Sequence, residues 1–218
     1  MRNSKGFTLV EIIVAVALVA ILSAAIAPSV LNNIAQGRVS RASSDVQAIA
    51  QAVMRFKNDT GYFPNLVFPS NTDSDSASQK FDYLASVEGD FAAAASGVNW
   101  PGAAATFSEG ASTDGSTQDI TSHLILGKAR GSTDSLYTRA EKPEDPASIG
   151  FRGGLLNADP QDPWRHKYVC NVAGLGWSGQ AIWVISAGPN GIIETNIALN
   201  GTGAAQSLTG DDIGFRIQ

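Results

Sequence analysis

Hydrophobic residues dominate the start of the chain, after a short polar stretch. An apolar run begins at Phe7 and continues to Ala27, and Glu11 is the one charged residue inside it. A helix rises about 1.5 Å per residue, so this run would span roughly 30 Å, the thickness of the hydrocarbon core of a bilayer. The pattern predicts a membrane-spanning helix over residues 7–28, and the basic residues within 1–6 place its N-terminus in the cytoplasm.

The helical pattern continues over residues 29–60. Its hydrophobic residues recur at spacings of three and four, which places them on one face of a helix. They are Val39, Ala42, Val46, Ile49, Val53 and Phe56, and the opposite face carries Arg38, Arg41, Asp45, Gln51 and Lys57. A two-stranded coiled coil would use such a stripe, but we favour packing on a sheet of the same chain, because a domain that needs a core follows. Gly61 and Pro64 would end the helix.

Segment 61–158 has little periodicity and predicts long exposed loops. Small and polar residues crowd the stretches 69–79 and 97–121. Two short elements are expected in this segment: a helix over Phe81–Val87, and either a helix or a short strand over Ser122–Leu126.

The last segment, 159–218, alternates β-rich runs with turns. Lys167–Val172 and Ala181–Ser186 are rich in β-branched and aromatic residues and flank a glycine-rich turn, which predicts an antiparallel hairpin. A tight turn follows at Ala187–Gly191, and a further run covers Gly210–Ile217. The expected fold class is α+β: a long N-terminal helix packed on a small C-terminal antiparallel sheet with long loops.

Charge and composition argue against several classes of function. The 218 residues carry 15 Lys and Arg against 20 Asp and Glu, a net charge of −5, so the chain has no electrostatic footprint for nucleic acid. The single cysteine, Cys170, can form neither an intramolecular disulfide nor, by itself, a thiolate metal site. His123 and His166 have no nucleophile and acid pattern around them, and Asp73 and Asp75 are interpreted as solvated loop residues. No catalytic residue is therefore predicted.

Glu11 is the unusual residue of the apolar run. A carboxylate at that depth costs on the order of 2.5–3.5 kcal/mol on insertion scales, so we expect it to have a partner. No Lys or Arg lies within the run. A cut between Gly6 and Phe7 would create an α-amino group one helical turn away. That amine could pair with Glu11 of the same subunit, or with Glu11 of a neighbouring subunit, which would set the register of an assembly.

The sequence GFTLVEIIVAVALVAILSAAIAPSVL resembles the class III signal of type IV pilins and type II secretion pseudopilins. The resemblance implies that a prepilin peptidase cleaves after Gly6 and methylates the new N-terminus at Phe7, and that the subunit then enters a helical filament. Glu11 occupies the registering glutamate position of that family. Pro28 lies where these helices carry a proline and can loosen on assembly. A proline inside a helix also removes a backbone donor, so a kink or local melting is expected there in any case.

Other interpretations of the N-terminal segment stay open. A cleavable secretory signal has a similar basic start and apolar core, and Ala25-Ile26-Ala27 looks like its cleavage site, but Glu11 in the core and Pro28 after the cut disfavour it. A permanent membrane anchor requires neither Glu11 nor the Gly6-Phe7 pair, and a buried soluble helix is a third possibility. A membrane-anchored enzyme or binding module is a separate class of function, for which no nucleophile, base and orienting group can be named.

The C-terminal segment is similar to that of the major pseudopilins, with a start at Asp159–Trp164, a small sheet, a Gly-Asx-Gly loop and a closing Asp-Asp-Ile. In that subfamily the loop binds calcium. The resemblance assigns the loop position to Asn190 and the later acid to Asp212, with Asp211 adjacent and Ala187 as a carbonyl donor, and oxygen-rich turns suit calcium. Asn190 replaces the usual aspartate and removes one negative charge. A plain Asx-Gly turn with solvated acids therefore stays open as the alternative.

The predicted function is that of a structural subunit in the inner membrane, with its globular domain in the periplasm. It would be processed and polymerised through its N-terminal helix into a pseudopilus-like filament for type II protein secretion. A type IV pilus pilin for adhesion or motility is the alternative, which the lack of a C-terminal cysteine pair disfavours. Expected partners are further copies of the chain, other pseudopilins or pilins, the prepilin peptidase and the inner-membrane assembly platform. Calcium is the one cofactor suggested.

Overall fold

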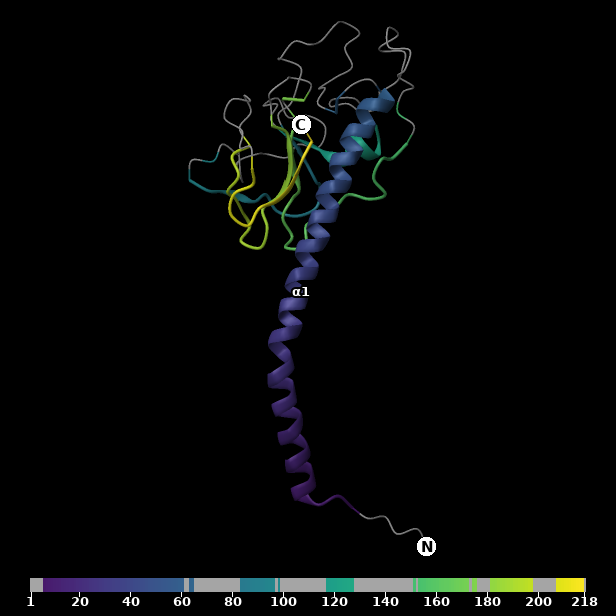
Figure 1. The fold of residues 1–218 in the computed structure, drawn as a ribbon. Coiled ribbons are helices and arrows are strands. Elements are labelled where there is room, and N and C mark those ends of the chain that lie inside the picture. The colour runs from purple at the N-terminus through teal and green to yellow at the C-terminus, as the bar shows by residue number, and fades with distance from the viewer. Residues whose placement is uncertain are drawn as a thin grey trace, which may run out of the picture. The chain divides into compact units, whose positions relative to one another are not determined.

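The computed structural model describes residues 6–60, 63–64, 83–96, 98, 117–127, 151, 153–172, 174–175, 181–197 and 207–217. Within them the chain forms one long helix followed by short strands and a π-helix (Figure 1). The elements are α1 (Leu9–Thr60), β1 (Tyr83–Ala85), β2 (Ala93–Ala94), β3 (Thr117–Asp119), η3 (Thr121–Ile125), β4 (Val169–Asn171), β5 (Trp183–Ser186), β6 (Ile192–Ile193) and β7 (Ile213–Arg216). The chain divides into two compact units, residues 1–40 and 41–218.

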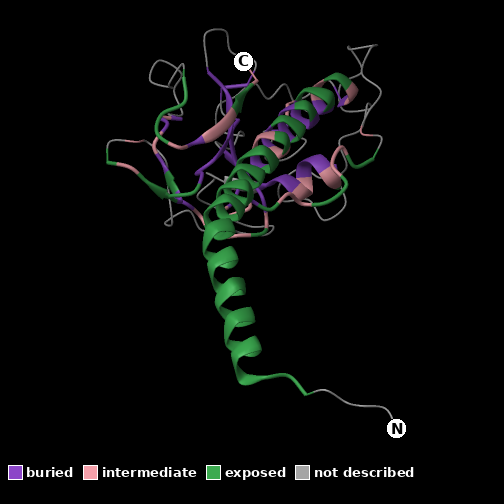
Figure 2. Ribbon diagram, turned by 60° about the horizontal axis from the view of Figure 1, so that its bottom comes forward, coloured by how far each residue is buried: buried purple, intermediate pink, exposed green. Residues whose placement is uncertain are grey.

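The first unit is the N-terminal part of α1. Every residue from Gly6 to Ser40 is exposed, as the uniformly green part of the helix in Figure 2 shows. Its backbone polar groups are satisfied along the helix itself, which is what a hydrocarbon environment demands. We expected a kink or local melting at Pro28; the helix is continuous through this residue, so it is not melted here.

Residues 41–60 of α1 belong to the second unit and pack against its sheet. The buried residues follow the predicted spacing: Ala42, Val46, Ile49, Ala50, Ala52, Val53, Phe56 and Thr60. Most of them share a core cluster with Leu84, Cys170 and Val184 of the strands. The prediction that the apolar stripe packs on a sheet of the same chain is therefore confirmed from Ala42 onward, whereas Val39 is 41% exposed.

The main sheet of the second unit has five strands in the order β3-β1-β4-β5-β7. The predicted hairpin is confirmed: β4 and β5 are antiparallel, with Val169 opposite Ile185 and Cys170 opposite Val184. β7 continues the sheet antiparallel to β5, and β1 is antiparallel to β4. At the other edge β3 is parallel to β1. A separate two-stranded parallel sheet joins β2 to β6.

Alternation along the strands gives the sheet two buried faces, because successive side chains of a strand point in opposite directions. Leu84, Cys170 and Val184 contribute to the cluster that includes α1. A second buried cluster contains their strand neighbours and residues of the following segments: Tyr83, Ala85, Val169, Trp183, Ile185, Ala92, Ile193 and Ile197. The segments that carry Ala92, Ile193 and Ile197 therefore contribute to this second buried cluster.

A polar contact joins α1 to the rest of the second unit. The Tyr168 hydroxyl donates to Asp45 Oδ2 at 2.9 Å, and Arg41 Nε lies 3.6 Å from the same oxygen. Burial, reinforced by Asp45, raises the pKa of Tyr168. Asp45, which the sequence places on the face opposite the apolar stripe, is only 28% exposed because its side chain contacts Tyr168.

Of the two short elements expected in segment 61–158, one was predicted wrongly and the other agrees with the expectation. The helix predicted over Phe81–Val87 is wrong: Tyr83–Ala85 forms strand β1, all of whose residues are buried between β3 and β4. A strand of three residues is too short to show its period in the sequence. Ser122–Leu126 was expected to be a helix or a short strand, and it is helical, as the π-helix η3 at Thr121–Ile125.

Several predicted features lie outside the described residues. They are residues 1–5 of the leader, the helix stop at Gly61, the loop 69–79 with Asp73 and Asp75, and most of the stretch 97–121.

Candidate functional site

The first turn of α1 closes on itself through Thr8 and Glu11. The backbone N–H of Thr8 donates to Glu11 Oε2 at 2.9 Å, and the Thr8 hydroxyl donates to the same oxygen at 3.0 Å. In return, the backbone N–H of Glu11 donates to the Thr8 hydroxyl at 3.3 Å. This reciprocal pattern is a capping box. The sequence Thr-x-x-Glu before an apolar run is its signature, and our sequence analysis gave Thr8 no role.

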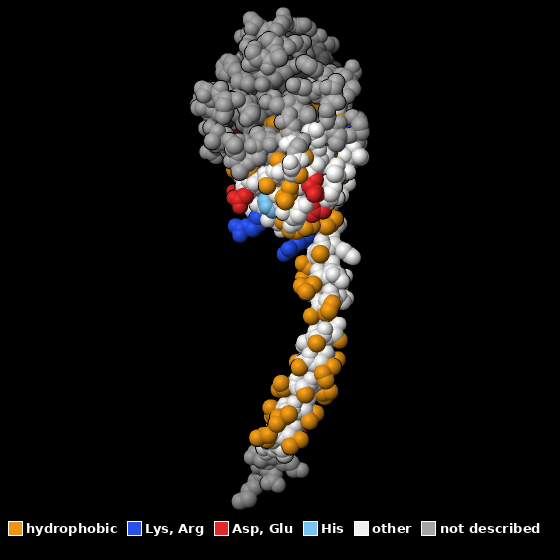
Figure 3. Space-filling view, turned by 90° about the vertical axis from the view of Figure 1, so that its left-hand side faces the viewer, with side chains coloured by type: hydrophobic (Ala, Val, Ile, Leu, Met, Phe, Trp, Pro, Cys, Tyr) orange, Lys and Arg blue, Asp and Glu red, His pale blue; other side chains and the backbone are white. Residues whose placement is uncertain are grey.

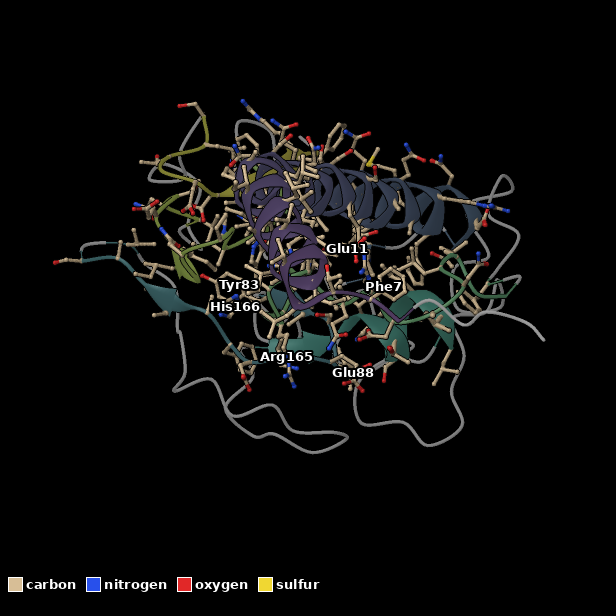
Figure 4. All side chains as sticks on the ribbon, turned by 90° about the horizontal axis from the view of Figure 1, so that it is seen from below. Phe7, Glu11, Tyr83, Glu88, Arg165 and His166 are labelled. Carbon is tan, nitrogen blue, oxygen red and sulfur yellow. The ribbon has the colours of Figure 1, made fainter. Side chains whose placement is uncertain are left out.

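The capping box leaves part of the Glu11 carboxylate available. Among the described residues, the Glu11 side chain accepts hydrogen bonds through Oε2 alone, so Oε1 can accept from an amine outside the subunit. Phe7 precedes the helix and is 84% exposed, and Gly6 has no atom near the position a side chain would take. Figure 4 labels Phe7 and Glu11 at this end of α1. The predicted processing bond and the predicted registering acid are therefore both accessible.

The surface that follows Glu11 is apolar on all sides. Its exposed side chains include Leu9, Ile13, Val16, Leu22 and Ile26, and hydrophobic side chains are spread along the helix on the face that Figure 3 shows. By length and composition α1 can cross a membrane, and its most apolar window is not buried within the chain. A surface of this kind needs lipid or other apolar helices around it, because large exposed apolar areas mark sites of membrane or protein contact.

The C-terminal loop residues come together around the turn that ends β5. Asn190 and Asp211 are in contact, since the Asn190 N–H donates to Asp211 Oδ2 at 3.1 Å. The Ile192 N–H donates to Asn190 Oδ1 at 2.7 Å, which makes this an Asx turn. Gly188 has φ +63°, and a Cβ there would lie 2.2 Å from the Asp211 carbonyl oxygen, so only glycine fits this approach. The predicted loop residues Asn190 and Asp211 are therefore neighbours.

Asp212 is buried and supports the segment after the turn. Its Oδ2 accepts from the N–H groups of Glu194 and Thr195, at 2.9 and 2.6 Å. Burial raises the pKa of Asp212, against these hydrogen bonds. Glu194, which our sequence analysis did not single out, accepts from the Asp211 N–H at 3.1 Å. These contacts hold residues 190–195 to residues 211–212.

Two carboxylate oxygens at this place lack a hydrogen-bond donor among the described residues. They are Asp211 Oδ1 and Asp212 Oδ1, which are both buried; this is costly for carboxylates and would be relieved by a cation. Within the described residues, no group of three or more His, Cys, Asp and Glu side chains is placed to hold a metal. The site fits calcium only if backbone carbonyls complete the shell, which calcium accepts. Ala187, the predicted carbonyl donor, is buried beside the turn.

The Asp-Pro-Gln-Asp-Pro-Trp stretch provides two structural carboxylates. Asp159 Oδ2 accepts from the N–H groups of Val87 and Glu88 at 2.8 and 3.0 Å, and its Oδ1 accepts from the Thr121 hydroxyl at 2.9 Å. Asp162 accepts from the Trp164 N–H at 2.6 Å and from the Ser186 hydroxyl. The stretch therefore ties the ends of β1, β5 and η3 together.

The two histidines lie in different environments. His123 is fully buried in η3, and burial lowers its pKa to about 3, so it is neutral at ordinary pH. His166 lies against the turn, since a Cβ on Gly191 would be 2.6 Å from its ring. Figure 4 labels His166 and its chain neighbour Arg165, which adopts φ 73°.

Comparison with known proteins concerns mainly the N-terminal region. A family model described as the prokaryotic N-terminal methylation motif matches residues 1–27. The type II secretion system core protein G of Pseudomonas aeruginosa is 39% identical over 64 residues, which are 29% of this chain and 45% of that protein. The protein of the same name from Vibrio cholerae is 33% identical over 64 residues, 29% of this chain and 44% of its own length. The chain thus spans less than half the length of these curated relatives. No solved structure shows a significant match.

Proposed function

We propose that this chain, whose N-terminal segment is that of a type IV pilin-like protein, is a structural subunit of a pseudopilus-like filament that serves type II protein secretion. The observation that carries the proposal is that the methylation motif of residues 1–27 coincides with an exposed apolar helix whose first turn holds a carboxylate. The similarity to core protein G supports secretion over an adhesive or motile pilus. The relatives also support a structural rather than a catalytic role.

The proposed route begins with the subunit in the inner membrane and its second unit in the periplasm. The prepilin peptidase cuts between Gly6 and Phe7, and the new amine lies at the start of α1. During assembly this amine pairs with Glu11 of a neighbouring subunit. A buried ion pair of this kind penalises wrong staggers, because an unpaired charge in an apolar bundle is expensive. The apolar surface of the helix exchanges lipid contacts for contacts with other helices.

The intact mass of the protein extracted from membranes tests the proposed processing. The expected mass lacks residues 1–6 and includes one added methyl group. A Gly6→Leu variant is the matched control, because it changes the residue at the cleavage bond and leaves the apolar run intact; it should keep the full mass. A full-length, unmethylated chain in cells that contain the peptidase would contradict the proposal. Co-purification with adhesive pili rather than with secretion-channel components would favour the alternative pilin.

We also propose that the loop of Asn190, Asp211 and Asp212 binds calcium. The support is the pair of buried carboxylate oxygens for which the described residues offer no donor and the turn that brings Asn190 to Asp211. Asp211 and Asp212 would hold the ion through their side chains, with backbone carbonyls such as that of Ala187 completing the shell. The ion supplies positive charge to a cluster whose described residues contain acids and amides. An affinity of about 0.1–1 mM is expected, as in extracellular calcium modules.

Thermal unfolding of the full chain in detergent, with calcium or with a chelator, tests this proposal. Calcium at about one hundred times its dissociation constant should add about 2.7 kcal/mol to the stability of the second unit. Asp212→Asn should lose this response yet fold well without calcium, because the amide oxygen can still accept from Glu194 and Thr195. Asp90→Asn, at an exposed acid outside the loop sequence, is the matched control. Equal melting of the unaltered chain with and without calcium would exclude the site.

A further inference from the structure

Asn190 and Gly191 form an Asn-Gly step whose geometry suits a chemical reaction. In such a step the backbone nitrogen after asparagine can attack the side-chain amide carbon, provided that the two atoms approach each other. The Ile192 N–H donates to Asn190 Oδ1 at 2.7 Å, and this Asx turn folds the side chain back over the Gly191 peptide. The turn thus places the Asn190 amide carbon next to the Gly191 nitrogen.

The same hydrogen bond assists the attack electronically. The amide oxygen becomes an oxyanion when the carbon is attacked, and an N–H already aimed at that oxygen stabilises the developing charge. The Ile192 N–H is such a donor. Its short distance shows that the donor is in place before the reaction begins.

The attacking nitrogen is weakly held and unobstructed. The Gly191 N–H has a bond of 3.4 Å to the Gly188 carbonyl, longer than the usual 2.7–3.2 Å. Gly191 has φ +71° and carries no Cβ; a Cβ would lie 2.6 Å from the His166 ring. The packing of His166 therefore requires glycine at the position where the attack meets least hindrance. Asn190 itself is exposed to water.

We propose that Asn190 is a site of spontaneous deamidation in the folded protein. Water removes the Gly191 amide proton, the nitrogen bonds to the Asn190 side-chain carbon, and the side-chain carbon–nitrogen bond breaks. The departing nitrogen takes up a proton and leaves as ammonia, which yields a cyclic imide. One water molecule then opens the ring at either carbonyl and gives aspartate or isoaspartate at position 190. One water enters and one ammonia leaves, with no change of oxidation state.

The conversion adds a negative charge to the loop at a specific place. The Asn190 N–H already contacts Asp211, and Asp211 and Asp212 each have a buried oxygen without a donor in the part of the chain that the structure describes. In the aspartate product, position 190 carries a carboxylate beside Asp211. This consequence rests on the proposed calcium site, and it would make older subunits stronger calcium binders than new ones.

Peptide mass mapping of the full chain in detergent, incubated near neutral to mildly alkaline pH in water enriched in heavy oxygen, tests the reaction itself. The peptide with Asn190 should gain about one dalton beyond the label and incorporate one labelled oxygen. The folded chain should convert at least as fast as the same chain in urea. Slower conversion in the folded chain than in urea would overturn the proposal, because the turn would then protect the residue.

Two comparisons sharpen this measurement. Asn200-Gly201 is the other Asn-Gly step of the sequence, and in urea it should convert at a rate similar to that of Asn190. Asn190→Gln lengthens the side chain and should remove the labelled product at position 190, whereas a persistent signal there would show that the assignment is wrong. Neither calcium nor filament assembly enters the experiment, so its failure is distinct from failure of the proposed function.

Discussion

Glu11→Gln is expected to reduce filament yield at least roughly tenfold while cleavage and membrane insertion continue. Glutamine has nearly the same shape, but it leaves the processed amine of the neighbouring subunit without a counter-charge inside an apolar bundle. Removing one partner of a buried ion pair costs about 3–5 kcal/mol, and every subunit of a filament would bear that cost. Filaments sheared from cells and quantified by immunoblot, together with the intact mass of the membrane-bound subunit, measure the effect.

Thr8→Val is the matched control for this experiment. It removes the hydroxyl of the capping box and retains the Glu11 carboxylate. Loss of a helix N-cap costs about 0.5–2 kcal/mol, so filaments should form with a smaller loss of yield. If Thr8→Val were as damaging as Glu11→Gln, Glu11 would act as a cap of its own helix. Filaments of Glu11→Gln with unchanged yield and stagger would contradict the assembly role.

Asp159→Ala is expected to destabilise the second unit by about 3 kcal/mol. Two backbone N–H groups and one hydroxyl lose their acceptor, and hydrogen bonds to charged groups contribute about 1.5–3 kcal/mol each, reduced here because Glu88 is exposed. The midpoint of thermal unfolding should fall by about 6–12 °C for a unit of this size. Circular dichroism of the detergent-solubilised full chain, in the absence of calcium, follows the transition.

Asp159→Asn separates hydrogen bonding from charge. An amide oxygen can still accept from Val87 and Glu88, and the amide NH₂ can donate to the Thr121 hydroxyl, so the expected loss is less than half of that for Asp159→Ala. Asp90→Asn, at an exposed carboxylate, should leave the midpoint unchanged. If Asp159→Ala and Asp90→Asn had the same midpoint of thermal unfolding, the hydrogen bonds that Asp159 accepts would contribute nothing to stability.

The helix was predictable because its signal is long and repeated. Six apolar residues at helical spacing predict a buried face; five of them are buried, and four of these share a core cluster with strand residues. β4 and β5 were predictable for a related reason, since two β-rich runs flank a turn. β1 was not predictable, because the strand conformation of its three residues depends on pairing with β3 and β4. Both of these strands lie far away in sequence. Tertiary context routinely overrides so short a local preference.

The candidate site divides in the same way. Phe7 and Glu11 stand out in the sequence because Phe7 begins the apolar run and Glu11 is the one charged residue inside it. Asp45 and Glu194 do not: a charge at helical spacing is ordinarily solvated, and only the fold brings Tyr168 to Asp45. Glu194 meets Asp211 across 17 residues, through a turn geometry that no spacing rule describes. The acids at 211 and 212 were found through their resemblance to a family, and their contacts come from the fold.

The apolar surface of α1 between Glu11 and Ala27 has a thermodynamic consequence for a subunit that changes surroundings. Lipid tails are as apolar as leucine, so a helix that moves from lipid to a bundle of like helices gains little from the hydrophobic effect. The free energy of the helix is therefore similar in lipid and in a bundle of like helices, and it is much less favourable in water. Tight packing and charge pairing decide the small difference between them. In the proposed assembly, a directed transfer of subunits out of the bilayer would therefore need work from outside the chain.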